Sequence, residues 1–153
     1  GLITLHTNSQ MHRDIAPKNI FLQGEVSKPQ EMAAKLGDFG VSRGFNSNEI
    51  SKGIVSYLGT LITGHLNAQE QIVQLTADIW AVGIIIYLML ARCMPYERLD
   101  SNYIEKSSPK PLPSYVPEDV MNLVEGLLEK NPEKRLSCHS ALKIIAPLMY
   151  IKQ

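Results

Sequence analysis

The most apolar stretch of the chain, "IWAVGIIIYLMLA" over residues 79–91, constrains the fold more than any other feature. It is too short to cross a bilayer, because a membrane-spanning helix requires about 20 apolar residues. Its isoleucines and valine would also suit a β-strand, but its length favours a helix. Since apolar residues occupy every side of that helix, we expect it to lie buried at the centre of a globular domain.

The composition of the 153 residues is typical of one soluble globular domain, with 44% hydrophobic and 20% charged residues and a formal net charge of zero. This balance gives no electrostatic reason to expect nucleic acid or a membrane as a partner. Cys93 and Cys138 lack metal-ligand spacing, so we expect free, packed thiols in a reducing compartment. No signal peptide is visible, and we expect a cytoplasmic or nuclear location.

The rest of the pattern predicts helices and one small β-hairpin. Residues 1–7 look like the end of a helix, and the apolar runs "NIFL" and "AAKLG" predict two strands joined by an enlarged loop. Residues 41–67 are rich in Ser, Asn, Gly and Thr and predict a long surface loop. Residues 107–117, which are rich in proline, predict an extended connector.

Two further helices are expected after this connector. Pro117 and two acids begin the first of them, whose apolar face is formed by Val120, Leu123, Val124, Leu127 and Leu128. Ser137 is expected to cap the last helix, which should end at Ile145 because Pro147 stops it. The sequence therefore predicts a mainly α fold.

Three short motifs occur in a fixed order. His12-Arg13-Asp14 is followed by Asn19 in the pattern H-R-D-x-x-x-x-N, "DFG" covers residues 38–40, and "DIWAVG" begins the apolar helix. Together they resemble the protein kinase superfamily, specifically the C-terminal lobe of its catalytic domain, over essentially all 153 residues. The resemblance implies an α+β family fold in which residues 1–153 form a partial kinase domain, with an activation segment at about 38–70.

The resemblance also implies roles for individual residues. Asp14 would orient or accept the proton of a substrate hydroxyl, while Asn19 and Asp38 would hold Mg²⁺ bound to ATP. Phe39 belongs to the same motif as Asp38, and Gly40 would let the backbone turn sharply after the metal ligand. The partner implied is a protein substrate with a serine or threonine hydroxyl.

Other motif residues are expected to be structural or regulatory. His12 would pack near the 38–40 motif, and Arg13 would meet a phosphate on the activation segment. Ser56 is the candidate phosphosite; its competitors are Ser51, Tyr57 and Thr60.

Two carboxylates of the motifs are expected to support the lobe. Glu70 in "NAQE" would form a buried ion pair with Arg135 in "NPEKRLS", and removal of one partner of such a pair costs about 3–5 kcal/mol. Asp78 would accept backbone hydrogen bonds from the loop that carries Asp14.

The loop "HRDIAPKN" departs from the family at Ala16, where serine/threonine kinases usually place a lysine that meets the γ-phosphate. Lys18 lies four positions after Asp14, where receptor tyrosine kinases place an arginine, so it would supply the missing cation. The alternative is that Lys18 is only a solvated surface charge. Pro17 and the pair Gly59-Thr60 favour serine/threonine substrates, and the loop motifs resemble those of NIMA-related kinases.

Further departures concern the surroundings of the loop. The segment "LITGHLN" is longer than in the family, Gln69 replaces a proline, and the helix usually found between residues 99 and 113 is poorly represented. Neither a glycine-rich loop nor a lysine-bearing strand occurs, so we expect an N-terminal lobe in cis before residue 1 and negligible phosphotransfer by these residues alone.

The leading hypothesis is therefore the C-terminal part of an ATP- and Mg²⁺-dependent protein serine/threonine kinase. The alternative is a pseudokinase or scaffold that keeps the fold without turnover, favoured by Ala16 and Gln69. A small-molecule phosphotransferase fits less well, because "DIWAVG", "NAQE" and "NPEKR" are protein kinase features.

Overall fold

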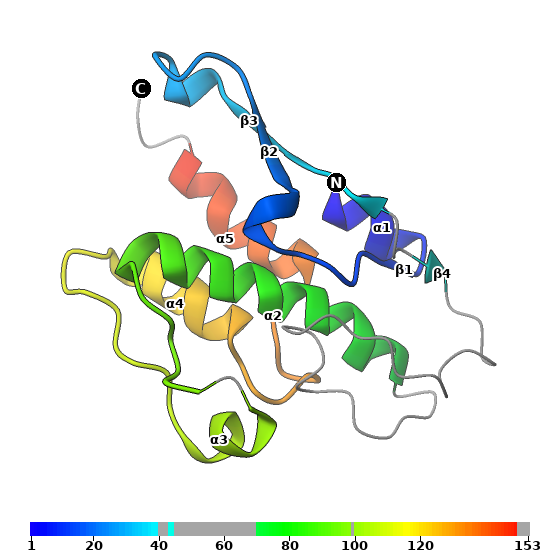
Figure 1. Ribbon diagram of the computed structural model, residues 1–153, viewed down its shortest axis with the longest axis vertical. Helices are drawn as coiled ribbons and strands as arrows, with labels where there is room; N and C mark the ends of the chain where they lie inside the picture. The colour runs from blue at the N-terminus through cyan, green and yellow to red at the C-terminus, as the bar shows by residue number, and fades with distance from the viewer. Residues whose placement is uncertain (40–42, 45–69, 99, 150–153) are drawn as a thin grey trace.

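The computed structural model describes residues 1–39, 43–44, 70–98 and 100–149 (Figure 1). The elements in chain order are α1 (Leu2–Thr7), β1 (Gln10–Met11), η1 (Pro17–Asn19), β2 (Ile20–Gln23), η2 (Pro29–Glu31), β3 (Ala33–Leu36), β4 (Arg43–Gly44), α2 (Glu70–Ala91), α3 (Ser101–Lys106), α4 (Glu118–Leu127) and α5 (Cys138–Met149). Helices predominate, as the sequence predicted. Among the described helices, none combines the length and apolar character that a membrane span requires.

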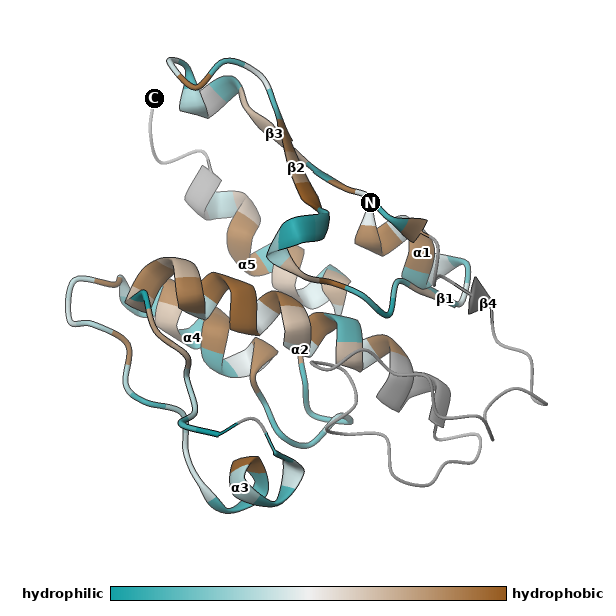
Figure 2. Ribbon diagram, viewed as in Figure 1, coloured by the Kyte–Doolittle hydropathy of each residue, from teal (hydrophilic) through white to brown (hydrophobic). Residues whose placement is uncertain are grey.

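The helix α2 is the central element of the fold, which confirms the prediction for residues 79–91. Figure 2 shows hydrophobic residues along much of its length. Trp80, Ile84 and Tyr87 pack with Val124 and Leu128 in one core cluster.

A second cluster joins α2 to the C-terminal helices through Ile79, Leu123, Leu127 and Ala141. Close contact between α2 and α4 depends on Gly83, because a Cβ atom there would lie only 2.9 Å from Leu127 Cβ.

The predicted hairpin is present. Strands β2 and β3 are antiparallel, with Ile20 opposite Leu36 and Gln23 opposite Ala33. The hairpin extends away from the helices at the top of Figure 1. A second pair, β1 with β4, was not predicted, since strands of two residues are too short to show a periodic pattern.

Two expectations about the helices are wrong. A helix does exist between residues 99 and 113: α3 begins after Asp100, whose Oδ1 accepts the Tyr103 N–H at 2.9 Å and caps it. Ser137 caps α5 by accepting the Ser140 N–H at 3.1 Å, as predicted, but the helix continues past Ile145 to Met149. Pro147 lies inside α5, where its fixed φ is compatible with a helix and its missing N–H removes one hydrogen bond.

Both cysteines are free thiols, as expected. Only Cys138 is packed, against the cluster that contains Ile79 and Leu127. Cys93 is exposed, so the expectation that it would be packed is wrong. It follows the end of α2, where Arg92 has a positive φ of 56°.

Candidate active site

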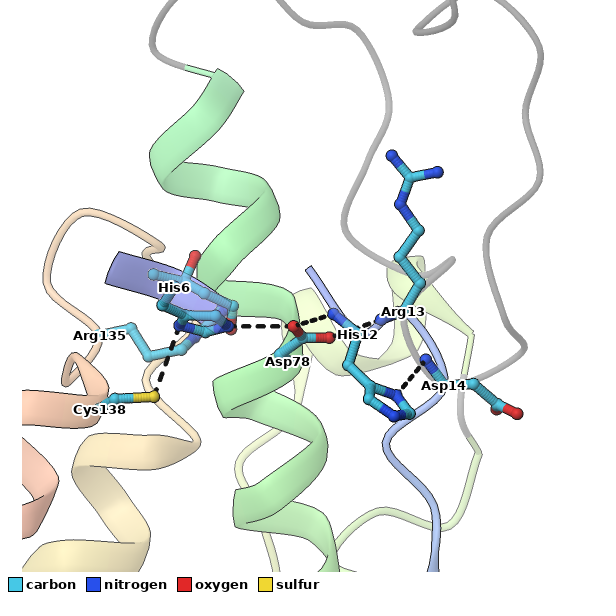
Figure 3. Close-up of polar contacts among 8 residues, drawn as sticks. His6, His12, Arg13, Asp14, Asp78, Arg135 and Cys138 are labelled. Carbon is cyan, nitrogen blue, oxygen red and sulfur yellow. Dashed lines mark hydrogen bonds and ion pairs between the residues drawn. The ribbon is translucent and has the colours of Figure 1, made fainter. Parts of the chain in front are cut away.

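The loop after β1 is held in place by the carboxylate of Asp78, which is only 3% exposed. Its Oδ2 accepts the His12 N–H at 2.8 Å, and its Oδ1 accepts the Arg13 N–H at 3.0 Å (Figure 3). These are the backbone hydrogen bonds that the sequence predicted for Asp78. The buried helix α2 therefore fixes the position of the segment that leads directly into Asp14.

Two residues of this site have a left-handed backbone conformation. Arg13 has a φ of 68° and Asp38 a φ of 59°, and neither is a glycine. Such conformations cost of the order of 1 kcal/mol or more and persist when surrounding contacts hold them. For Arg13 the contact is the hydrogen bond from its own N–H to Asp78.

His12 connects this loop to the segment that contains Asp38. Its side chain is fully buried, and its Nε2 lies 2.9 Å from the carbonyl oxygen of Gly37. A carbonyl can only accept, so Nε2 carries the proton in this hydrogen bond. The imidazole also meets the ring of Phe39 edge-on, with 5.2 Å between ring centroids. His12 thus packs beside the 38–40 motif, as predicted.

The carboxylate of Asp14 lies between an amide and an ammonium group. Asn19 Nδ2 donates to the main-chain oxygen of Asp14 at 2.8 Å and to its Oδ2 at 2.9 Å, and Lys18 Nζ lies 3.1 Å from the same Oδ2. Burial raises the pKa of Asp14, but the hydrogen bonds from Lys18 and Asn19 and the neighbouring positive charge outweigh it, so the pKa lies below its ordinary value. Asp14 is accordingly a charged acceptor at neutral pH.

The short helix η1 brings Lys18 to this position. It begins after Ala16 with Pro17, whose fixed φ suits the first helical position, and one turn places Lys18 beside Asp14. The Lys18 side chain is 70% exposed, so its ammonium group contacts Asp14 and also faces solvent. A cation thus lies next to the candidate catalytic carboxylate although position 16 is alanine.

Arg135 is a buried cation that ties the C-terminal segment to α2. Its guanidinium donates to the carbonyl oxygens of Thr76, Glu129 and Lys130 at 2.8, 2.7 and 3.2 Å. It also lies over the ring of Trp80, 4.9 Å from the centroid. Burial lowers the pKa of Arg135 to about 10, which leaves it charged at neutral pH.

One participant in the site was missed from the sequence. His6, on α1, has its Nε2 3.0 Å from Asp78 Oδ2, so Asp78 accepts from three donors. The other ring nitrogen of His6 lies 3.5 Å from the sulfur of Cys138. A single histidine near a helix end carries no motif, and only the packing of α1 against α2 and α5 reveals its role.

Several predicted residues lie outside the described part of the chain. They are Gly40, Ser51, Ser56, Tyr57, Thr60 and the side chain of Glu70. The phosphosite and the ion pair between Glu70 and Arg135 therefore stay predictions.

Comparison with known proteins identifies the family. Residues 1–144 match the family model described as "Protein kinase domain", so the chain belongs to the protein kinase domain family.

The curated relatives are serine/threonine kinases. The chain is 29% identical over 148 residues to serine/threonine-protein kinase ppk25 of Schizosaccharomyces pombe, a match that covers 94% of this chain and 33% of ppk25. It is 32% identical over 152 residues to the Aurora kinase of the same yeast, covering 94% of this chain and 39% of that kinase. It is 32% identical over 131 residues to the G2-specific protein kinase nimA of Emericella nidulans, covering 82% of this chain and 17% of nimA. The chain therefore spans well under half the length of each of these relatives.

Proposed function

We propose that this chain is the C-terminal lobe of a protein serine/threonine kinase, which transfers the γ-phosphate of ATP to a protein hydroxyl. The observation that supports this most directly is the environment of Asp14. Its carboxylate is held by Asn19 and Lys18 on a loop that is itself fixed by the buried Asp78. Phosphoryl transfer depends on positioning and on stabilisation of charge, and both are served by such an arrangement.

In this proposal Asp14 orients the attacking hydroxyl and accepts its proton. Its lowered pKa keeps it ionised and able to accept a hydrogen bond, and the amide of Asn19 fixes which way the carboxylate faces. A relative exposure of 21% leaves the Asp14 side chain accessible to a substrate group. Positioning of this kind lowers the barrier because the reacting groups are already aligned.

The donor atoms of Asn19 and Asp38 fit Mg²⁺. The nitrogen of the Asn19 amide is committed to Asp14, which leaves the amide oxygen for a metal ion, and Asp38 adds a carboxylate. Within the described residues no cluster of three or more His, Cys, Asp or Glu side chains could hold a metal. Two oxygen ligands suffice for Mg²⁺, which keeps several waters and binds substrate phosphates. When bound, Mg²⁺ with ATP supplies the phosphoryl group and neutralises its charge.

Lys18 is proposed to contact the transferring phosphate. Its ammonium group touches Asp14 and faces solvent, where it can reach an anion beside the carboxylate. A cation at this place stabilises the charge that develops during transfer. Lys18 would thus replace the lysine that the family usually carries at position 16.

The hairpin β2–β3 is proposed to face the nucleotide and an N-terminal lobe. Phe21, Leu22 and Val26 are 58%, 66% and 84% exposed, and β2 leads directly out of η1, which contains Asn19. Phe21 and Leu22 are consecutive in β2 and face opposite sides of the hairpin, and Val26 lies in its loop, so large apolar side chains are exposed on both sides, which favours a covering partner. An N-terminal lobe in cis would cover them and complete the nucleotide site.

Arg13 is proposed to bind a phosphate on the activation segment, with Ser56 as the candidate phosphosite. Figure 3 shows the Arg13 side chain directed away from Asp78, which contacts only its backbone. Within the described part of the chain, its guanidinium forms no ion pair with a carboxylate. A cationic fork in this position suits a phosphate group.

The test uses two proteins, the 153-residue chain and the chain extended by any upstream coding sequence. With Mg²⁺ and radiolabelled ATP, the extended protein is expected to phosphorylate a serine/threonine substrate, and the 153 residues alone are not. Asp14→Asn should abolish turnover, and Asp119→Asn, at an exposed acid on α4, should not.

Lys18→Ala should lower the rate far more than Lys28→Ala, which removes a lysine paired with Glu31. Equal rates for these two variants would refute the role of Lys18. An extended protein that folds and binds ATP without turnover would support the scaffold alternative instead.

A further inference from the structure

We propose that Cys138 is a positioning residue for the loop that carries Asp14: its thiol donates to Nδ1 of His6 and orients the ring so that Nε2 donates to Asp78. The importance of this contact for phosphotransfer rests on the proposed function of Asp14. The hydrogen-bonded chain itself does not, since it is defined by contacts among α5, α1 and α2 (Figure 3).

The direction of each hydrogen bond follows from its acceptor. Asp78 Oδ2 is a carboxylate oxygen 3.0 Å from Nε2 of His6, so Nε2 carries a proton. In a neutral imidazole the other nitrogen, Nδ1, then has a lone pair and must accept. Its neighbour at 3.5 Å is the sulfur of Cys138, which can donate only as a thiol.

The surroundings of Cys138 keep it a thiol. Burial raises its pKa to about 11, the negative charge of Asp78 contributes in the same direction, and the backbone and the Gly1 amino group act weakly against them. Cysteine, histidine and aspartate in contact also occur at nucleophilic sites, where the sulfur is a thiolate of lowered pKa. The opposite shift here indicates a hydrogen-bond donor and not a nucleophile.

The contact matters for the loop because Asp78 Oδ2 is shared. The same oxygen accepts from His6 Nε2 and from the backbone N–H of His12, at 3.0 and 2.8 Å. Without the thiol, Nδ1 of His6 loses its Cys138 partner in a side chain that is only 12% exposed, so the imidazole is held less firmly against Oδ2. A displaced ring would shift Oδ2 and weaken the hydrogen bond that the same oxygen accepts from His12.

The first measurement leaves Cys138 itself unmutated. In a Cys93→Ser protein, Cys138 is the remaining cysteine of the two in the chain, and its S–H stretch can be recorded by Raman spectroscopy. We expect this stretch to lie at lower frequency than in the same protein carrying His6→Phe, where the acceptor Nδ1 is absent, because a donating S–H bond is weakened. The same frequency in both proteins would overturn the proposal.

The second measurement is the hydrogen exchange of the His12 and Arg13 amides. We expect Cys138→Ala to accelerate it by about threefold to tenfold, the equivalent of one neutral hydrogen bond. Cys138→Ser, whose hydroxyl can still donate, should restore part of the protection. Cys93→Ala makes the same change at an exposed thiol and should leave exchange unaltered.

Unchanged exchange in Cys138→Ala, or equal acceleration in the alanine and serine variants, would refute the role of the thiol proton. In a turnover assay, Cys138→Ala should lower kcat without changing KM for ATP. A protein without turnover would count against the proposed function alone, because the Raman and exchange results decide the positioning role independently.

Discussion

Replacement of Asp78 by asparagine tests the contact that fixes the candidate active site to the core. The two oxygens of Asp78 accept from three donors, the backbone N–H groups of His12 and Arg13 and the Nε2 of His6. Asparagine has the same shape but only one acceptor oxygen. If the asparagine oxygen takes the place of Oδ2 and keeps its two donors, the asparagine NH₂ group faces the N–H of Arg13. The hydrogen bond that Asp78 accepts from Arg13 is then lost.

The destabilisation caused by Asp78→Asn follows from the charge and the burial of Asp78. A hydrogen bond to a charged group contributes about 1.5–3 kcal/mol, and Asp78 is 3% exposed, so water cannot replace it. We therefore expect Asp78→Asn to lower the free energy of unfolding by about 2–3 kcal/mol. This is a large part of the 5–15 kcal/mol typical of a domain.

Urea unfolding measures this change, and native-state hydrogen exchange locates it. The amide of Arg13 should exchange about 30- to 150-fold faster, which is the same free energy expressed as an equilibrium constant. Asp119→Asn, at an exposed acid in the first turn of α4, should shift stability by less than about 0.5 kcal/mol. If Asp78→Asn is no more destabilising than this control, the anchoring role assigned to Asp78 is refuted.

Three further changes test other parts of the structure. Lys18→Ala should raise the pKa of Asp14, because the hydrogen bond from Lys18, which lowers that pKa, is lost while the effect of burial remains. An NMR titration of the Asp14 carboxyl carbon measures this change. Ionised Asp14 stabilises the fold at pH values above its ordinary pKa of 3.8, and this stabilisation is lost as the pH falls through its lower pKa in the folded protein. The greater stability of the parent protein relative to Lys18→Ala should therefore disappear in acid. Arg135→Lys should cost about 3 kcal/mol in urea unfolding, because an ammonium cannot reproduce three guanidinium hydrogen bonds, whereas Arg98→Lys at an exposed site should be near neutral. Gly83→Ala should lower the midpoint of thermal unfolding. Overpacking of the new methyl group against α4 costs about 1–3 kcal/mol, which exceeds the gain in helix propensity of about 1 kcal/mol.

Much of the fold was predictable because it depends on local sequence patterns. The apolar run within α2, the face of α4 and the two strands of the hairpin were all expected from their periodicity and turn residues. The predictions were wrong where one residue determines whether a helix forms or where it ends. One capping aspartate, Asp100, suffices for the short helix α3, and one proline near the end of α5 does not stop it.

The sequence by itself determined which residues carry the candidate chemistry, since motif spacing singles out Asp14, Asn19 and Asp38, and it fixed the helix that would support them. Only the tertiary structure decided how that support is made. It placed Lys18 against Asp14, and it joined His6 to Asp78 and Cys138 to His6, from opposite ends of the chain. The physical reason is that a hydrogen bond depends on distances of about 3 Å between groups, and such distances between remote residues are set by the packing of helices rather than by sequence spacing.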